Sequence, residues 1–152
     1  MRVGLISDTH GLLRPEALDF LAGADHIVHG GDIGSPDILE RLAALAPLTV
    51  VRGNNDTAPW AHEIPATARV DLGRVALYAI HDLKELDIAP RAAGVRIVVS
   101  GHSHRPACTE RDGVLYVNPG SAGRRRFSLP IAAAELVIDG DQVHARIVIL
   151  VP

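Results

Sequence analysis

Short apolar runs alternate with glycine-rich polar turns along most of the chain. Runs rich in Val, Ile and Leu that are bounded by Gly, Asn, Asp or Pro are typical of strands. The pattern predicts strands over residues 3–6, 26–29, 48–51, 67–72, 75–80, 96–99, 107–111, 114–117, 131–138 and 142–151.

Three segments between these strands carry helical signals. Residues 16–22 have apolar positions at helical spacing, directly after a proline. Residues 37–46 follow a Ser-Pro pair, which is typical of the start of a helix. A third helix is expected over residues 83–93, although Pro90 weakens its far end.

The two halves of the chain differ in the way their strands are connected. Strands alternate with helices in the first half, which favours parallel βαβ units. The second half has hairpin signals at Gly73, Asp112-Gly113 and Asp139-Gly140, which favour antiparallel strands. We expect an α/β protein with one domain over residues 1–152.

Composition narrows the class of protein. The 152 residues are 47% hydrophobic but only 3% aromatic, so aliphatic side chains must fill the core. A net charge of -3 argues against a general nucleic-acid-binding face. Cys108 is the only cysteine, and no apolar run approaches the roughly 20 residues that span a bilayer. We expect a cytoplasmic protein that lies in no membrane.

Polar residues that bind metals follow five of the apolar runs. They are Asp8 with His10, Asp32, Asn54, His81, and His102 with His104. Each of them alone has an ordinary explanation, such as a helix cap, a turn residue or a surface histidine. Together they predict a metal site, because the ends of parallel strands meet at one edge of a sheet.

Two metal ions account for these side chains better than one. Seven side chains exceed the three protein ligands that are usual for a single catalytic zinc ion. Imidazole, carboxylate and amide donors without a thiolate suit Mn²⁺, Fe or Zn²⁺. Two dications offset by Asp8, Asp32 and a bridging hydroxide leave about one positive charge, which attracts an anion such as phosphate.

The order of the motifs resembles that of the calcineurin-like metallophosphoesterases. The matching residues are Asp8-Thr9-His10, Gly31-Asp32, Gly53-Asn54-Asn55-Asp56, His81 and Gly101-His102-Ser103-His104. The small size and Asn118-Pro119-Gly120-Ser121 resemble the YfcE-like phosphodiesterases, which are related to Vps29. The resemblance implies a four-layer αββα sandwich, with two mixed sheets packed face to face and helices outside.

The resemblance also implies a role for each of the seven residues. Asp8, His10 and His104 hold the first ion, Asn54, His81 and His102 hold the second, and Asp32 bridges them. Mn²⁺ is the first choice of ion, with Fe, Zn, Ni or Mg as alternatives. A hydroxide between the ions then attacks phosphorus in line with the leaving group. Asp32, Asn54 and His81 act catalytically through this centre.

Other residues near the motifs leave alternatives open. Many members of the superfamily have a proton-donating histidine where this chain has Asn55, so we expect a preference for acidic leaving groups. His29 is expected to support the site or fill the core, and His62 is an alternative proton donor. Asp82 either orients His81 or caps a helix. Arg124, Arg125 and Arg126 either form a solvated basic loop or include one arginine that binds phosphate or a carboxylate of a partner.

The sequence therefore predicts a binuclear metal-dependent phosphoesterase that acts on a small phosphoester, with diesters favoured over monoesters. A Vps29-like interaction scaffold with a structural metal site is the alternative from another class. A phosphomonoesterase for small metabolites is a further alternative. Members of the family often assemble, so a homo-oligomer is also expected, with Trp60 or the edge strands as contacts.

Overall fold

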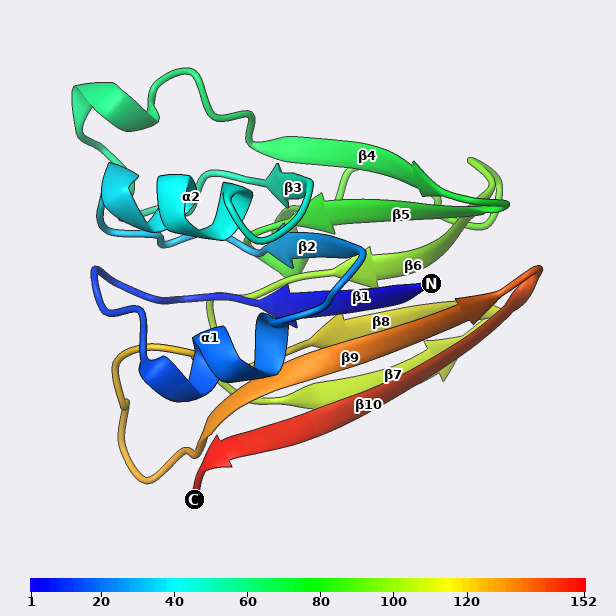
Figure 1. Cartoon of the computed structure of the whole chain (residues 1–152). Helices are drawn as coiled ribbons and strands as arrows, with labels where there is room; N and C mark the ends of the chain where they lie inside the picture. The colour runs from blue at the N-terminus through cyan, green and yellow to red at the C-terminus, as the bar shows by residue number, and fades with distance from the viewer.

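Two mixed sheets of five strands each lie face to face in the computed structural model, which describes residues 1–152 (Figure 1). The first sheet has the order β10-β9-β1-β2-β3. Its strands are β1 (Arg2–Ile6), β2 (His26–His29), β3 (Leu48–Val50), β9 (Ile131–Asp139) and β10 (Gln142–Val151). The second sheet, β4-β5-β6-β8-β7, consists of β4 (Thr67–Leu72), β5 (Val75–Ile80), β6 (Val95–Val99), β7 (Ala107–Arg111) and β8 (Val114–Asn118). The predicted pair of mixed sheets is confirmed.

The main core lies between the two sheets. Alternation along β1 turns Val3 and Leu5 toward the second sheet, where they pack in one cluster with Leu77 of β5. Leu5 and Leu77 are completely buried. The side chains are aliphatic, as the scarcity of aromatic residues predicts.

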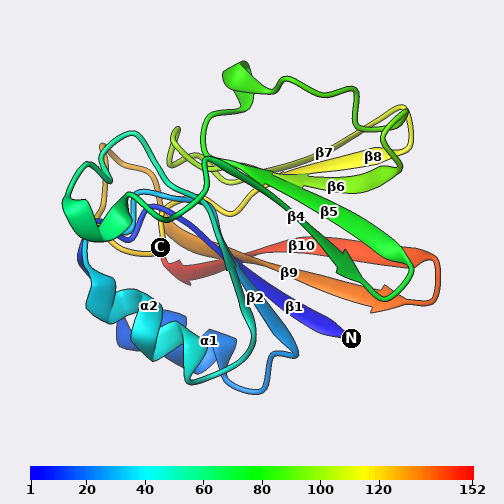
Figure 2. The same ribbon diagram turned by 90° about the horizontal axis from the view of Figure 1, so that it is seen from above.

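Helices cover only the outer face of the first sheet (Figure 2). The two helices are α1 (Pro15–Leu21) and α2 (Pro36–Ala43). Ser35 caps α2, because its side chain accepts a hydrogen bond from the Asp37 amide. The helix ends before the predicted Ala46, because the residue before Pro47 disfavours helical backbone angles. None of the helices is long and apolar enough to cross a membrane.

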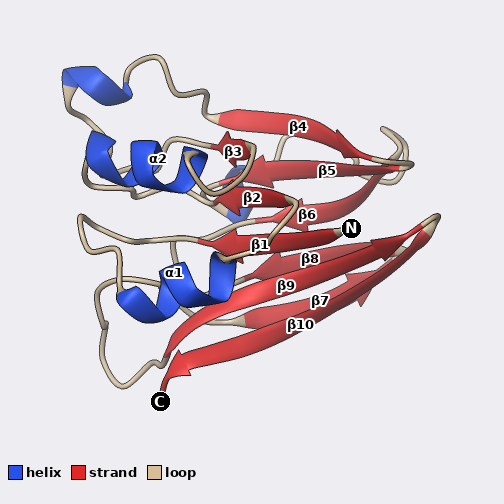
Figure 3. Ribbon diagram, in the orientation of Figure 1, coloured by secondary structure: helices blue, strands red, loops and turns tan.

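The helix predicted over residues 83–93 is wrong, and Figure 3 shows loop in its place. Only the short 3₁₀ helix η2 (Leu83–Glu85) forms, in addition to η1 (Pro59–Ala61) elsewhere. Leu83, Leu86 and Ile88 pack on the outer face of the second sheet, and their spacing does not follow one face of a helix. Pro90 also removes a backbone donor. This face is therefore covered by an irregular segment.

The parallel strands of both sheets end at one edge of the sandwich. The arrows of β1, β2, β3, β5 and β6 point the same way in Figure 1, and β1-β2-β3 and β5-β6 are parallel ladders. Loops that follow these strands come from distant parts of the sequence but meet at this edge.

We expect Leu5→Ala to destabilise the protein by about 3 kcal/mol, because the change leaves a cavity between the sheets. Chemical denaturation followed by circular dichroism measures this loss. Val137→Ala, on the exposed face of β9, is the control and should change the free energy of unfolding by less than about 0.5 kcal/mol. Equal losses in both variants would contradict the assignment of this core.

Candidate metal centre

All seven predicted ligand residues lie in the loops that follow β1, β2, β3, β5 and β6. Asp8 and His10 follow β1, and the others follow β2, β3, β5 and β6 in turn: Asp32, Asn54, His81, and His102 with His104. The tertiary structure brings them together in two adjoining groups.

The first group consists of Asp8, His10 and His104, whose candidate ligand atoms lie within 4.8 Å of one another. Asp8 Oδ1 lies 3.4 Å from His104 Nε2 and 3.7 Å from His10 Nε2. The two imidazole nitrogens are 3.3 Å apart. Asp8 is completely buried, and its Oδ1 atom has no hydrogen-bond partner.

The second group consists of Asp32, His81 and His102, with Asn54 beside it. His81 Nε2 lies 3.2 Å from Asp32 Oδ2, and Asn54 Oδ1 lies 3.2 Å from His102 Nδ1. Asp32 Oδ2 is also 3.5 Å from His10 Nε2 of the first group. One carboxylate therefore faces both groups.

Buried atoms without hydrogen-bond partners suit a role as metal ligands. Asp8 Oδ1, His81 Nε2 and His104 Nδ1 are all buried without a hydrogen-bond partner, and such atoms are costly unless something binds them. His81 Nδ1 lies 2.7 Å from Gly30 O, so Nδ1 carries a proton, and in the neutral ring the lone pair is on Nε2. Nitrogen and oxygen donors of this kind suit divalent transition metals.

The charge distribution also favours a cation. Burial opposes ionisation of Asp8, but the imidazoles of His10 and His104 that face it and the hydrogen bond from Ser7 outweigh burial and hold the pKa of Asp8 far below its usual value. Burial likewise opposes protonation of His81, but the Asp32 carboxylate and the charge of Asp8 raise its pKa to about 8. The two carboxylates thus create a negative potential that stabilises positive charge.

Five of the seven residues have a left-handed backbone, which residues other than glycine seldom adopt. Their φ angles are 56° for Asp8, 45° for His10, 57° for Asp32, 72° for His102 and 61° for His104. Each such residue costs on the order of 1 kcal/mol or more, and strain of this kind concentrates at functional sites. The strain indicates that the backbone is shaped to aim these side chains.

Asp56 holds the loop that carries Asp32, and its role was missed by the sequence analysis. Its buried carboxylate accepts backbone hydrogen bonds from Asp32 and Gly53 at 2.9 Å each, and others from Ile33 and Gly34. A Cβ atom on Gly53 would overlap Asp32, so only glycine permits this approach. The signal for Asp56 was its place in the Gly53-Asn54-Asn55-Asp56 motif.

His29 joins the loops after β1 and β2, which confirms its predicted place behind the site. It is completely buried, and burial lowers its pKa to about 4, so the ring is neutral. Nδ1 accepts from the Gly31 amide and Nε2 lies 3.0 Å from Thr9 Oγ1, which donates to Ile33 O. The chain of hydrogen bonds fixes Asp8 relative to Asp32.

Three other side chains that the sequence singled out have defined partners. Asn55 donates to Asp32 through its backbone amide at 2.9 Å and its side-chain amide at 3.1 Å. Asp82 accepts from the Lys84 amide, so the capping interpretation is confirmed. His62 is exposed, and its Nε2 atom lies 3.3 Å from Thr57 O.

The three consecutive arginines after β8 differ in their contacts. Arg124 donates to His10 O, and Arg125 donates to Leu129 O and Pro152 O. The Arg126 side chain makes no hydrogen bond or ion pair, and its charge opposes the rise in the pKa of His10 that Asp8 causes. Arg126 is therefore the one with a free guanidinium near the first group.

Comparison with known proteins gives matches over nearly the whole chain. The family model described as "Calcineurin-like phosphoesterase superfamily domain" matches residues 1–141. A probable metallophosphoesterase from Methanothermobacter thermautotrophicus is 35% identical over 160 residues, which cover 97% of this chain and 92% of that protein.

Solved structures with the same fold include enzymes and a sorting protein. An archaeal phosphodiesterase has a TM-score of 0.80 and 22% identity, covering 97% of this chain and 100% of that chain. YfcE, a phosphoesterase from E. coli, has a TM-score of 0.72 and 25% identity, covering 94% and 91%. Vps29 from Chaetomium thermophilum has a TM-score of 0.79 and 17% identity, covering 97% of each chain.

Asp56→Asn should lower stability by about 3 kcal/mol, because it removes a buried charge and turns an amide donor toward backbone donors. It should also weaken Mn²⁺ binding, because the loop that carries Asp32 loosens. Urea denaturation of metal-free protein and calorimetric titration with Mn²⁺ measure the two effects. Asp19→Asn, on the exposed side of α1, is the control for the lost charge. Unchanged stability in Asp56→Asn would contradict this role.

Proposed function

We propose that this chain, which belongs to the calcineurin-like phosphoesterase superfamily, is a phosphoesterase with two metal ions and acts on small phosphodiesters. The observation that carries the proposal is the pair of ligand groups that share Asp32. A single carboxylate facing two sets of imidazoles suits two ions a few ångströms apart, since such ions share a bridging carboxylate.

The proposed ligands divide between the two groups. Asp8, His10 and His104 would hold one ion, and Asn54, His81 and His102 would hold the other, with Asp32 between them. Mn²⁺ is the proposed ion at both positions. When bound, such ions supply Lewis acidity and lower the pKa of water to near neutrality.

The side chains around the centre suit a phosphoester with an acidic leaving group. The Arg126 guanidinium would stabilise negative charge on the phosphate oxygens, because it forms no hydrogen bond or ion pair within the protein and its charge acts on His10. Asn55 orients Asp32 through two hydrogen bonds, and an amide supplies no proton to a leaving oxygen. The leaving group therefore departs as the anion.

Two cavities beside the centre support a diester as substrate. One has a volume of about 590 Å³ and the other about 400 Å³, and both are lined by Asp82 and His102. A phosphodiester has two organic groups, and each of the two cavities would hold one of them. A scaffold like Vps29 shares the fold, but it does not require all seven ligand side chains to converge.

Metal-stripped protein should regain hydrolysis of bis-p-nitrophenyl phosphate when Mn²⁺ is added. Asp32→Asn should lower kcat at least about 100-fold, because both ions lose a shared ligand. Asp19→Asn serves again as the matched control and should keep full activity. A well-folded protein that stays inactive with Mn²⁺, Fe²⁺ and Zn²⁺ would contradict the enzyme and favour the scaffold.

Arg126→Gln should reduce kcat/KM for the same diester about 10- to 100-fold, because one charge-assisted hydrogen bond to phosphate is lost. Steady-state kinetics of the Mn²⁺-loaded protein measures the change. Arg125→Gln removes the same charge from the same loop, but its guanidinium binds Leu129 and Pro152 carbonyls. Equal losses in the two variants would mean that general charge, rather than a contact by Arg126, attracts the substrate.

A further inference from the structure

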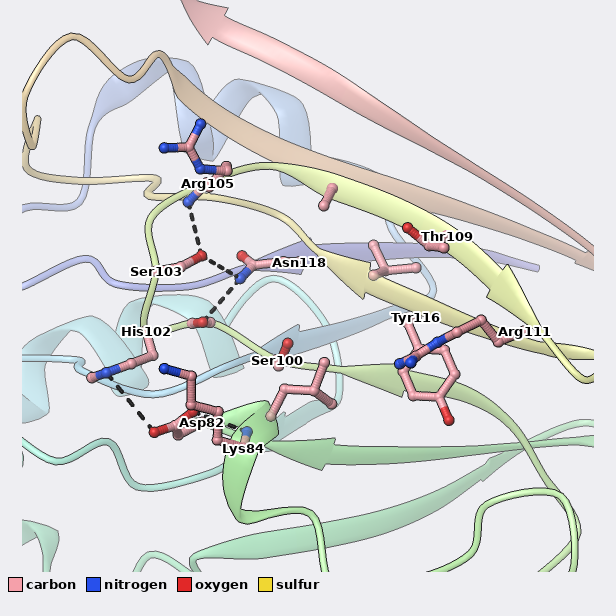
Figure 4. Close-up of a pocket in the computed structure, with 14 residues that line it drawn as sticks. Asp82, Lys84, Ser100, His102, Ser103, Arg105, Thr109, Arg111, Tyr116 and Asn118 are labelled. Atoms are coloured by element: carbon pink, nitrogen blue, oxygen red, sulfur yellow. Dashed lines mark hydrogen bonds and ion pairs between the residues drawn. The ribbon is translucent and has the colours of Figure 1, made fainter.

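The larger of the two cavities lies on the outer face of the second sheet, which no α-helix covers (Figure 4). We call it the outer pocket and define it by the lining residues Lys84, His102, Arg105, Arg111, Tyr116 and Asn118. It is open because the segment after β5 forms only the short helix η2. The outer pocket begins at the metal centre, since His102 belongs to both.

The rim of the outer pocket beside the metal centre is held in place by Asn118. Its side-chain amide donates to Gly101 O at 2.9 Å and lies 3.1 Å from Ser103 Oγ. Its Oδ1 atom accepts from the Gly120 amide at 2.9 Å. These contacts fix the loop that carries His102 and give the pocket a rigid entrance from the reaction site.

Positive charge dominates the lining of the outer pocket. Lys84, Arg105 and Arg111 line it, and none of them forms an ion pair. Asp82 is the one acidic residue in the lining, and its carboxylate is engaged with the Lys84 amide at the edge beside His102. Three positive charges and one negative charge give the lining a net charge of +2, which a dianion would balance.

Arg111 is oriented for binding an anion. Its guanidinium lies over the Tyr116 ring, 4.3 Å from the ring centroid, and Figure 4 shows it turned toward the interior of the pocket. Stacking of this kind holds the guanidinium plane but leaves its in-plane N–H groups free, and these match the oxygens of phosphate in pairs. Tyr116 is thus a positioning residue for Arg111.

Arg111 lies beyond Asn118 as seen from the metal centre. Tyr116, on which Arg111 stacks, is two residues from Asn118 along β8, which is about 7 Å. A substrate with its reacting phosphate at the metal centre would therefore need an extended ester chain to bring a charged group to Arg111.

We infer that the outer pocket recognises a second phosphate group, carried as a phosphomonoester on the non-leaving ester group of the substrate. The inference rests on the proposed function, because it takes the metal centre as the place of the reacting phosphate. It narrows the substrate class to phosphodiesters with a terminal phosphate, which has nearly two negative charges at neutral pH.

The test uses three matched p-nitrophenyl phosphodiesters whose second ester group is the same straight chain, of three to six carbon atoms, ending in a phosphate, a carboxylate or a hydroxyl group. We expect kcat/KM of Mn²⁺-loaded protein to be about 10- to 100-fold higher for the phosphate end than for the hydroxyl end. Arg111→Gln should remove most of this ratio. Arg74→Gln makes the same charge change in the exposed turn between β4 and β5, away from the pocket, and should preserve the ratio.

Binding to metal-free protein separates the outer pocket from catalysis. NMR titration should show tighter binding of the phosphate-ended diester than of the hydroxyl-ended one, and Arg111→Gln should abolish the difference. Selective binding without any Mn²⁺-dependent turnover would support the pocket and contradict the proposed function. Turnover with equal kcat/KM for all three ends, or a carboxylate end as good as the phosphate end, would overturn the inference.

Discussion

Two buried carboxylates, Asp8 and Asp32, impose the constraint on which the rest of the site depends. Burying carboxylates near one another is costly unless positive charge or hydrogen-bond donors surround them. The imidazoles of His10, His81 and His104 gather around them for this reason, and the pKa of His81 rises to about 8 in response. Divalent ions would satisfy the same requirement more completely, because they would also bind Asp8 Oδ1 and His81 Nε2, which have no hydrogen-bond partner.

The loops at this edge depend on the layers behind them for their shape. The left-handed backbone at five ligand positions costs free energy, and the conformational preferences of these residues do not offset that cost. Asp56 and His29 offset that cost with buried hydrogen bonds, and the aliphatic core holds the strands that bring the loops together. The arrangement is consistent with a site that is rigid before any ligand binds, which favours electrostatic stabilisation of a phosphate.

Different elements cover the two outer faces of the sandwich, and only one of these faces contains a pocket. Two helices bury the outer face of the first sheet, where they pack on residues such as Ile27. The second sheet has only the segment after His81, whose apolar side chains cover part of that face. The uncovered part becomes the outer pocket beside His102, and its lining is cationic. The asymmetry gives the proposed enzyme a specificity surface next to its reaction centre.

The sequence alone determined every strand and hairpin, because short aliphatic runs between glycine-rich turns are a local pattern. It also placed the ligand types at strand ends, and the match of motifs indicated the family. It was wrong over residues 83–93, since the packing of Leu83, Leu86 and Ile88 on the second sheet outweighs the local helical tendency. Only the tertiary structure decided that Asp56 accepts hydrogen bonds from the loop that carries Asp32. It also decided that the Arg126 side chain, unlike that of Arg124, has no hydrogen-bond partner, and that Arg111 stacks on Tyr116. Asp56 and Asp32 are far apart in the sequence, and only the folding of the sheet makes them neighbours. Arg111 and Tyr116 lie on the two strands of one predicted hairpin, but the hairpin pattern does not say which side chains stack across it.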